Sequence, residues 1–572
     1  MARPTQPVPH HGIVYATPGE LFGKESSLEE VRQHFSGVSR SAMTTLLCRL
    51  GVTFSPSSSG KAVEVDRSLL RPLLLPPAVR ELVDAFDSEH RPPDAGVAFC
   101  RPQILLALRL AQHFCPDFDQ PTLSTETLQK IGLALIHVSS LLVDGRDTKG
   151  ERPEDGAAAK KHVAAMMMSL FEVSNPPTSV HSLRRTFEMT RSPRWEQDPV
   201  LVEAGKAFHT QVGLTLPEYF SVVAGLVSKF TTDPHPGRVI EVLMAETLKS
   251  APSRDGIRNA LDRISLPYEA LPSHTPAPEE AIHDASICPF RARPLIALPD
   301  ERYLCADATF LSMLITTGLF WSVREMLPPP QQKALFPAWG LLFEDYVHDS
   351  LEPCFPEGTY IRSPVDRDDQ EITDALVDYG SDVVLVEVKA VLVRDELKYG
   401  RDLDKILALL EERLLKKGQI VRALTRLFDR RSGANEAERL LKDRFVERVY
   451  PVIVTYEHAL CGPFIAEFLN ERLQQQIREA GLPKHPVVKP LTLIAADDVD
   501  LLEPLLRHGI KLSRMLKEFT DFGRADVSFH NYLFDIARKA RKPFQAGPEH
   551  TRFLDECLAF WKAQGLPEGT TW

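Results

Sequence analysis

The sequence has few cysteines and no apolar run long enough to cross a membrane. Its eight cysteines are scattered over 572 residues without a Cys-x-x-Cys pair, which excludes a disulfide framework and a paired-cysteine zinc site. We therefore expect reduced and mostly buried thiols. The best candidate for a membrane span, 308–323, has 16 residues and is shorter than the roughly 20 that a bilayer requires. It predicts a buried helix.

Several signatures of catalysis and targeting are also missing. The N-terminal segment lacks the apolar stretch of a signal peptide, so a cytoplasmic protein with no membrane partner is expected. Ser59-Gly60-Lys61 lacks the upstream glycine and the final hydroxyl of a phosphate-binding loop. No G-x-S-x-G or H-E-x-x-H pattern occurs. These absences argue against an ATP-driven motor, a serine hydrolase of that type and a zinc protease.

The overall composition is that of a soluble globular protein with more than one domain. Apolar residues make up 43% of the chain and charged residues 25%, and the formal net charge is −11. An acidic total argues against a protein that coats nucleic acid through its bulk charge.

The order of sequence patterns divides the chain into segments. Helical periodicity dominates up to about residue 265, and strand patterns become frequent only after a proline-rich stretch. Alternating strands and helices then predict an α/β domain. The expected segments are a flexible tail at 1–25, a helical N-terminal region at 26–265, a proline-rich linker at 266–294, the α/β domain at 295–530 and a helical C-terminal extension at 531–572.

The α/β domain is expected to open with a hairpin at 294–305. Further strands are predicted at 359–362, 372–379, 382–393, 448–456 and 491–495.

One of these strands carries two charges inside an apolar run. Residues 383–393 are eleven in number, and nine of them are Val, Leu or Ala, as is typical of a strand buried on both faces. Glu387 and Lys389 are two residues apart, so both side chains leave the same face. Burying each charge costs several kcal/mol unless it is paired or bound. A solvated face would show polar residues at 385, 391 and 393, which are apolar, so we expect this pair to perform chemistry.

A further carboxylate is spaced to join this pair. Twelve residues separate Asp374 from Glu387, with a turn signal at Gly380, so a hairpin would place the two carboxylates side by side. Neighbouring carboxylates repel unless a cation lies between them. Mg²⁺ prefers carboxylate, carbonyl and water oxygens. We therefore expect Asp374, Glu387 and the backbone carbonyl of Val388 to bind Mg²⁺, while Lys389 orients or deprotonates a water and stabilises transition-state charge.

This D-x12-E-x-K arrangement resembles the PD-(D/E)xK nuclease superfamily, which has the restriction-endonuclease-like fold. The resemblance implies a mixed central sheet flanked by helices and a Mg²⁺-dependent phosphodiesterase in which Mn²⁺ can substitute. It further implies a DNA endonuclease, with RNA as the alternative substrate. The sequence departs from the family pattern in that no proline precedes Asp374. This leaves Asp378 as the alternative metal ligand.

The resemblance also implies two functional helices beside the sheet. The helix before the first core strand often carries a Glu that reaches the metal, and Glu344 lies about 30 residues upstream of the first carboxylate on an amphipathic pattern. A solvated position is the alternative for Glu344. A second helix is predicted at 397–431, where relatives contact the substrate. Lys398, Lys405 and Gln419 are the candidates there, although an ordinary solvated helix face is the favoured interpretation of all three.

The local distribution of charge favours binding of nucleic acid more than the net charge of the whole chain does. Residues 365–387 contain eight carboxylates and one arginine, a local charge of −7, and residues 397–431 contain ten basic and five acidic residues, a local charge of +5. An acidic pocket attracts a divalent cation, and a basic helix attracts the phosphate backbone.

The helical N-terminal region leaves the wider role open. In superfamily members of this layout, such a region often regulates defence against foreign DNA, and here it would bind a partner protein or a second copy. A pattern at 31–51 predicts a helix-turn-helix or an ordinary helical hairpin, with Ser39 as the cap of its second helix. The alternative to a nuclease is a catalytically inactive or RNA-directed binding scaffold on the same fold.

Overall fold

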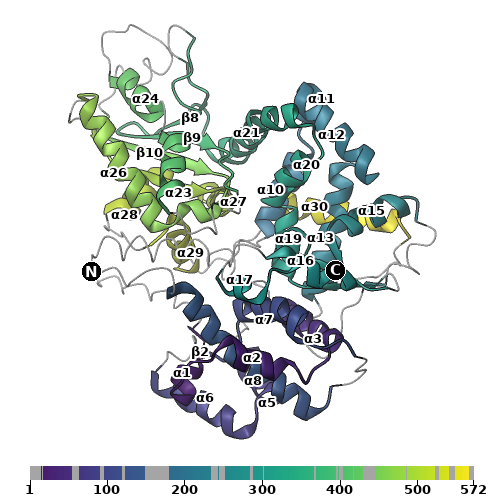
Figure 1. Ribbon diagram of the computed structural model, residues 1–572. Helices are drawn as coiled ribbons and strands as arrows, with labels where there is room; N and C mark the ends of the chain where they lie inside the picture. Colours follow the sequence, from purple (N-terminus) through teal and green to yellow (C-terminus); the bar gives the residue numbers. More distant parts are fainter. Residues whose placement is uncertain are drawn as a thin grey trace. The chain divides into compact units, whose positions relative to one another are not determined.

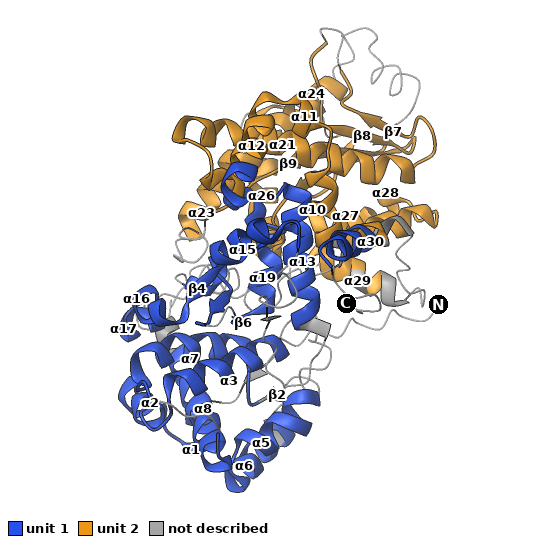
Figure 2. Cartoon of the chain, turned by 90° about the vertical axis from the view of Figure 1, so that its right-hand side faces the viewer, with its two compact units in different colours: residues 1–178, 208–322, 554–572 blue, residues 179–207, 323–553 orange. Residues whose placement is uncertain are grey.

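The computed structural model shows a mostly helical chain that forms two compact units. Unit 1 comprises residues 1–178, 208–322 and 554–572, and unit 2 comprises residues 179–207 and 323–553 (Figure 2). The structure describes all residues except 1–13, 16, 55–63, 91–95, 119–122, 148–179, 233–241, 244–250, 284–287, 300–301, 366–368, 395–396, 398–402, 416–417, 429–445, 483, 485, 522–526, 540–547 and 566–572.

Unit 1 is built mainly from helices (Figure 1). Four of them, α2 (Leu28–Phe35), α3 (Arg40–Thr53), α7 (Arg101–Phe114) and α8 (Thr125–Asp147), pack on one another around a buried apolar core. Other helices described in unit 1 are α1 (Pro18–Phe22), α5 (Arg71–Leu74), α6 (Pro77–His90), α13 (Leu216–Thr232), α15 (Arg254–Arg263), α16 (Leu271–His274), α17 (Pro278–His283), α18 (Pro289–Ala292) and α19 (Ala308–Leu314). Helix α1 lies within the tail that was expected to be flexible, and a capping box at Thr17 begins it.

Helices α2 and α3 are the pair that the pattern at 31–51 predicts. The hydroxyl of Ser39 accepts a hydrogen bond from the backbone N–H of Ala42 at 3.2 Å, so the predicted cap is confirmed. Val31 and Phe35 on α2 and Leu47 on α3 are fully buried. Contact of this pair with DNA stays a prediction.

The cysteines and the apolar stretch at 308–323 are both largely buried. None of the eight cysteines forms a disulfide, and six of them are buried. The apolar stretch at 308–323 is largely buried, but it forms two helices instead of one, because α19 ends at Leu314 and α20 (Gly318–Glu325) follows a turn. No helix in the described part of the chain combines the length and the apolarity that a membrane span requires.

A small sheet in unit 1 contains the hairpin predicted at 294–305. Strands β5 (Leu295–Ala297) and β6 (Arg302–Cys305) pair antiparallel, and β4 (Ser265–Pro267) and β3 (Val242–Leu243) extend the sheet in the order β3-β6-β5-β4. The hairpin therefore belongs to unit 1 and does not open the α/β domain as expected. The stretch 266–294 is also more structured than a linker, since it contains the end of β4, a 3-10 turn and the helices α16, α17 and α18.

Unit 2 contains a mixed sheet that includes all five strands predicted after the hairpin. These are β7 (Tyr360–Arg362), β8 (Ala375–Asp378), β9 (Asp382–Lys389), β10 (Arg448–Thr455) and β12 (Thr492–Ala495). Strands β7, β8 and β9 are antiparallel neighbours, whereas β10 runs parallel to β9 and to β12. A short strand, β11 (Val487–Val488), pairs with the start of β10. An α/β unit with a mixed sheet therefore follows a helical region, as the sequence predicts.

Helices pack against this sheet in two groups. Helices α21 (Pro329–Leu351), α27 (Ala496–Arg507) and α10 (Val180–Thr190) contact one another, whereas α26 (Pro463–Glu479) contacts α24 (Gln419–Phe428). Other helices described in unit 2 are α11 (Arg194–Gln197), α23 (Leu403–Leu410), the π-helix η5 (Glu411–Leu415), α28 (Leu512–Asp521) and α29 (Phe529–Lys539). Two further helices, α12 (Pro199–Val212) and α30 (Pro548–Ala563), each begin in unit 2 and end in unit 1.

The region predicted as a single helix at 397–431 is divided. Its described residues form α23, the π-helix η5 and α24, and Gly418 before α24 has φ +56°. This left-handed conformation favours glycine and ends regular α-helix geometry. The expected continuous helix is therefore wrong, because the apolar periodicity passes through a backbone break.

The unit boundaries also differ from the segments expected from sequence. Residues 179–207, expected in the helical N-terminal region, belong to unit 2, while residues 295–322 belong to unit 1. The expected C-terminal extension is divided between the units after residue 553. Each unit is therefore assembled from segments that are distant in the sequence.

Candidate functional site

The site is built on the hairpin of β8 and β9. These strands pair antiparallel with Ala375 opposite Val386. Continuing the register by one residue places Asp374 opposite Glu387, and residues paired in this way project from the same face. The connecting turn contains Gly380 with φ +85°, a left-handed conformation that glycine adopts without steric cost. The twelve-residue spacing in the sequence thus becomes direct juxtaposition.

Lys389 joins the two carboxylates. Its Nζ lies 2.6 Å from Oε2 of Glu387 and 3.2 Å from Oδ2 of Asp374. The backbone N–H of Val388 donates to the same oxygen of Asp374 at 2.5 Å. Asp374 and Glu387 are only 7% and 2% exposed. The structure therefore brings Asp374, Glu387 and Lys389 together in one buried group, which we call the acid–lysine cluster.

Burial and mutual repulsion shift the titration of this cluster. Burial, followed by the charge of Asp374, raises the pKa of Glu387 to about 7. Burial likewise raises the pKa of Asp374, in spite of the neighbouring ammonium and the Val388 N–H. Burial alone would lower the pKa of Lys389, but the two carboxylates overcome this effect and the pKa is raised. Lys389 therefore carries its proton at neutral pH, and the carboxylates hold more negative charge than it neutralises.

The donor set of the cluster fits a divalent cation. Two ionised carboxylates and one ammonium would have a net charge of −1 in a buried place, and the repulsion between the carboxylates adds to the effect of burial in raising the pKa of Glu387. Carboxylate oxygens are preferred ligands of Mg²⁺. The backbone of Val388 lies beside Asp374, since its N–H donates to that side chain. Asp374 and Glu387 would hold the ion, and the Val388 carbonyl stays the predicted third ligand.

Glu344 lies on α21, near the cluster. Its charge contributes to the raised pKa values of Asp374 and of Glu371, which places the three carboxylates in one electrostatic environment. Glu344 is half-buried, and its Oε1 is 3.7 Å from Nε2 of the buried His348. The other ring nitrogen of His348 is hydrogen-bonded to the hydroxyl of Tyr360 at 2.7 Å. Glu344 is therefore partly shielded from solvent and close enough to Asp374 for their charges to interact.

The predicted substrate-binding residues are less closely connected to the cluster. Lys398 lies outside the described residues. Lys405 is exposed on α23, and Gln419 is half-buried at the start of α24. Neither is among the hydrogen-bond or ion-pair partners of the two cluster carboxylates. Both stay predictions.

The structure favours Asp374 over Asp378 as the metal ligand. Asp378 lies four residues further along β8, about 13 Å away at about 3.3 Å per residue. Its Oδ1 accepts a hydrogen bond from the N–H of Gly380 at 2.7 Å. Asp378 therefore shapes the hairpin turn, whereas Asp374 contacts Lys389.

This distinction predicts different effects of two isosteric substitutions. Asp378→Asn keeps an oxygen that can accept from Gly380, so we expect Mn²⁺ affinity within about twofold of the unmodified protein. Asp374→Asn removes a ligand charge and is expected to weaken Mn²⁺ binding about tenfold or more. Isothermal titration calorimetry measures both. Equal weakening by the two substitutions would show that Asp378 also binds the ion.

Sequence reasoning missed several neighbours of the site. Glu371 has a raised pKa, caused by burial and then by Asp374, and Arg426 on α24 donates to its backbone carbonyl at 2.8 Å. The hydroxyl of Thr373 donates to the carbonyl of Val386 at 2.8 Å and fixes the start of β8. The proximity of Glu371 and Thr373 to Asp374 in the sequence was a usable signal, whereas nothing in the sequence indicated the contact of Arg426.

A comparison of the chain with protein-family models, with curated proteins and with solved structures finds no match. The function therefore has to be inferred from the residues themselves.

Proposed function

We propose that unit 2 is a metal-dependent nuclease that hydrolyses phosphodiester bonds, with DNA as the substrate and cleavage within the strand. The observation that carries this proposal is the acid–lysine cluster, in which one ammonium contacts two buried carboxylates with raised pKa values. A buried excess of negative charge beside a lysine is suited to hold a cation and to act on a phosphate group.

Each residue of the cluster has a role in this proposal. Asp374 and Glu387 bind the divalent cation, which polarises the phosphoryl group and activates the attacking water when it is bound. Glu344 approaches from α21 and orients water near the two carboxylates. Lys389 is protonated and points at the same place, so it stabilises the negative charge that develops on the phosphoryl oxygens. The Val388 N–H fixes the orientation of Asp374 through its hydrogen bond.

The surroundings of the cluster also support the proposal. The cluster lies on the neighbouring strands β8 and β9 of a mixed sheet. Helix α21 with Glu344 precedes these strands, and α24, which carries Arg422 and Arg426 and no acidic residue, follows them. This is the arrangement that the resemblance to PD-(D/E)xK nucleases implies. Regulation by the helical region and a role in defence against foreign DNA are part of the same proposal.

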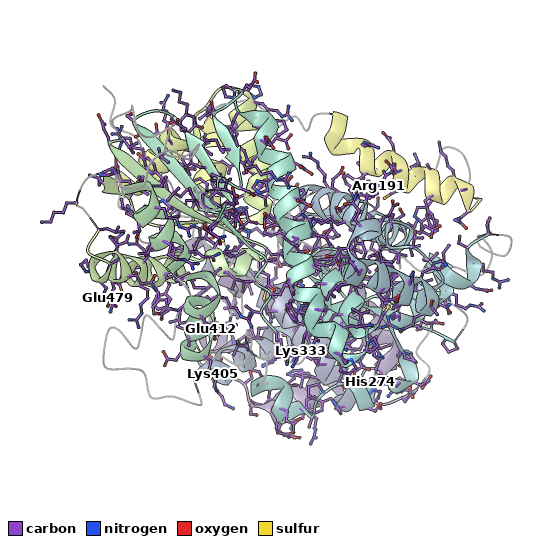
Figure 3. The ribbon with its side chains drawn as sticks, turned by 90° about the horizontal axis from the view of Figure 1, so that it is seen from above. Arg191, His274, Lys333, Lys405, Glu412 and Glu479 are labelled. Carbon is purple, nitrogen blue, oxygen red and sulfur yellow. The ribbon has the colours of Figure 1, made fainter. Side chains whose placement is uncertain are left out.

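The test is cleavage of supercoiled plasmid DNA with Mg²⁺, with the unmodified chain compared with Lys389→Ala. We expect nicking by the unmodified chain and its loss on chelation. We expect the cleavage rate of the variant to be reduced by at least about 100-fold. Lys333→Ala, at an exposed position near the start of α21 (Figure 3), is the matched control and is expected to retain most of the activity. Circular dichroism establishes that each variant is folded.

Three outcomes would contradict this proposal. Equal nicking by the unmodified chain and Lys389→Ala would indicate a contaminating nuclease. Cleavage of RNA but not of DNA would change the substrate. No cleavage of either polymer with Mg²⁺ or Mn²⁺ would favour an inactive scaffold.

A further inference from the structure

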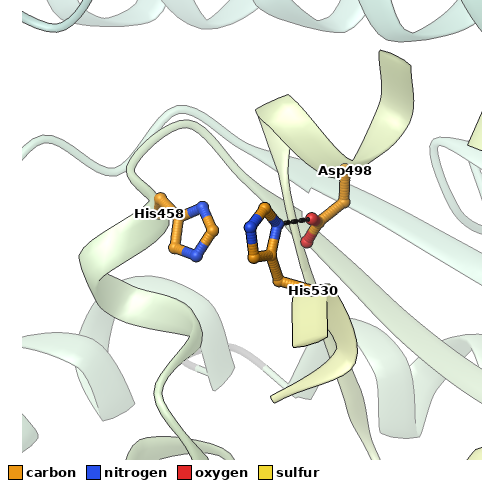
Figure 4. A group of neighbouring side chains, drawn as sticks. All are labelled: His458, Asp498 and His530. Carbon is orange, nitrogen blue, oxygen red and sulfur yellow. Dashed lines mark hydrogen bonds and ion pairs between the residues drawn. The ribbon is translucent and has the colours of Figure 1, made fainter. Parts of the chain in front are cut away.

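A second group of ionisable side chains lies in unit 2, apart from the acid–lysine cluster. His458 begins the 3-10 turn η7 (His458–Cys461), Asp498 lies in the first turn of α27, and His530 lies in the first turn of α29. Figure 4 shows the three side chains converging from these separate elements. We call this group the His–Asp–His cluster.

The His–Asp–His cluster lies beyond the ends of the parallel strands. Thr455, the last residue of β10, pairs with Lys389 at the end of β9 and with Ala495 at the end of β12. The turn η7 follows β10, and α27 follows β12 directly. Both clusters are therefore at the same end of the parallel strands, but on different strands.

The three side chains are close enough to share one ion. One ligand atom from each lies within 4.8 Å of the other two. Nδ1 of His530 is 2.5 Å from Oδ1 of Asp498, and the two imidazole rings are 4.2 Å apart at their centroids with an angle of 79°. The second ring nitrogen of His530 faces His458 (Figure 4). Asp498 is fully buried and His458 is 7% exposed.

Further contacts hold these side chains in place. Oδ2 of Asp498 accepts the backbone N–H of Ala495 at 2.9 Å. Oδ2 of the adjacent Asp497 is 3.9 Å from Nδ1 of His458, and its other oxygen accepts from Arg185 at 2.6 Å. Asp497 therefore lies beside His458 but outside the three-residue group. A carboxylate in such a position orients a histidine ligand of a metal ion.

We propose that His458, Asp498 and His530 bind one first-row transition-metal ion, with Zn²⁺ as the reference ion. Two imidazoles and one carboxylate are a donor set of Zn²⁺ and its neighbours, and not of Mg²⁺. An Asp498–His530 ion pair alone would tie α29 to α27, but it gives no reason to bury a second imidazole against the first. An ion shared by both rings supplies that reason.

The geometry requires only a small adjustment to bind the ion. Ligand atoms of a tetrahedral Zn²⁺ are about 3.3 Å apart, given Zn–N and Zn–O distances of about 2.0–2.2 Å. Side-chain rotations that move the ligand atoms by about 1–2 Å bring them to this separation. Water completes the coordination. The ion would join the end of β10 to α27 and α29, and so fix the part of the sheet beside the acid–lysine cluster.

The test measures Zn²⁺ retention in full-length Asp374→Asn, a background that weakens metal binding at the acid–lysine cluster. Protein stripped with a chelator is loaded with Zn²⁺, dialysed against metal-free buffer and assayed by mass spectrometry for metal content. We expect about one Zn²⁺ per chain in this background. We expect the affinity for Zn²⁺ to be reduced by at least about 100-fold when His458→Ala or His530→Ala is added. His209→Ala, an exposed histidine, is the matched control and should retain the ion.

A ligand exchange keeps the test decisive if an alanine variant fails to fold. His458→Cys supplies a thiolate, so its Co²⁺ form should gain a sulfur-to-cobalt charge-transfer band while keeping about one ion per chain. Three results would overturn the proposal. The first is Zn²⁺ retention that is equal with and without His458 and His530, and the second is no Zn²⁺ retention in the Asp374→Asn background. The third is Co²⁺ uptake by His458→Cys without the new band. Because the readout is metal content, it does not depend on nuclease activity.

Discussion

Replacing Glu387 with glutamine is expected to abolish Mg²⁺-dependent cleavage and to stabilise the fold of the metal-free protein. The acid–lysine cluster carries two buried carboxylates and one ammonium, so its net charge is −1. Glu387→Gln leaves Asp374 and Lys389 as a balanced pair at 3.2 Å and removes the repulsion between the carboxylates. It also removes a metal ligand, so we expect a loss of about 1,000-fold or more in cleavage rate.

The stability gain should depend on pH in a defined direction. The pKa of Glu387 is raised by burial from 4.5 to about 7 in the folded chain, so the folded state binds the proton more tightly than the unfolded state. Stability of the unmodified protein therefore falls as the pH rises from about 4.5 to about 7, and Glu387→Gln lacks this loss. We expect the variant to be more stable by about 1–3 kcal/mol at pH 7.5 and much closer to the unmodified protein at pH 4.5.

Urea denaturation in the presence of a chelator, at the two pH values, measures this difference. Adding Mg²⁺ should stabilise the unmodified protein at pH 7.5 and have little effect on the variant, since binding to the folded state adds stability. Glu479→Gln, on an exposed face of α26 (Figure 3), is the matched control and should change neither activity nor stability. A Glu387→Gln protein that is less stable at pH 7.5 would show that the Lys389 contact outweighs the carboxylate repulsion.

The central strands and the cluster on them could be predicted because their signals are local. The apolar run at 383–393 predicts a buried strand, which the structure forms over Asp382–Lys389 and ends four residues early. The spacing between Asp374 and Glu387, with a glycine turn, leaves one register that pairs them. Lys389 follows from the period of two. A hairpin of this kind depends on neighbouring residues alone, so its geometry is encoded in a short stretch of sequence.

Other features depend on contacts between distant segments and could not be predicted. The His–Asp–His cluster combines residues from three elements, and no spacing relates 458, 498 and 530. The boundary of unit 2 was missed because α10 joins it through contacts with α21 and α27, which lie far along the chain. The left-handed backbone of Gly418 was not predicted because leucine periodicity continues on both sides of it.

The charges that join α10 to unit 2 form a buried network with α27. Nη1 of Arg185 is 2.6 Å from Oδ1 of Asp497, and Nη1 of Arg184 is 2.8 Å from Oε2 of Glu503. The guanidinium of Arg185 also lies 5.0 Å from the ring centre of Tyr456. Arg185 is 1% exposed and Asp497 is 4% exposed. Neither charge can be solvated if its partner is removed.

Arg185→Leu is therefore expected to destabilise unit 2 by about 3–5 kcal/mol, because breaking a buried ion pair leaves an uncompensated charge. Arg191→Leu, at the exposed residue that follows α10 (Figure 3), is the matched control, with an expected loss below about 1 kcal/mol. Urea denaturation followed by the tryptophan signal measures both, since Trp195 and Trp339 lie in unit 2. The double variant Arg185→Leu/Asp497→Leu should recover part of the loss, because removing both charges leaves no buried charge unpaired. A double variant as unstable as the sum of the two single variants would show that Arg185 acts through packing on Tyr456 and not through its charge.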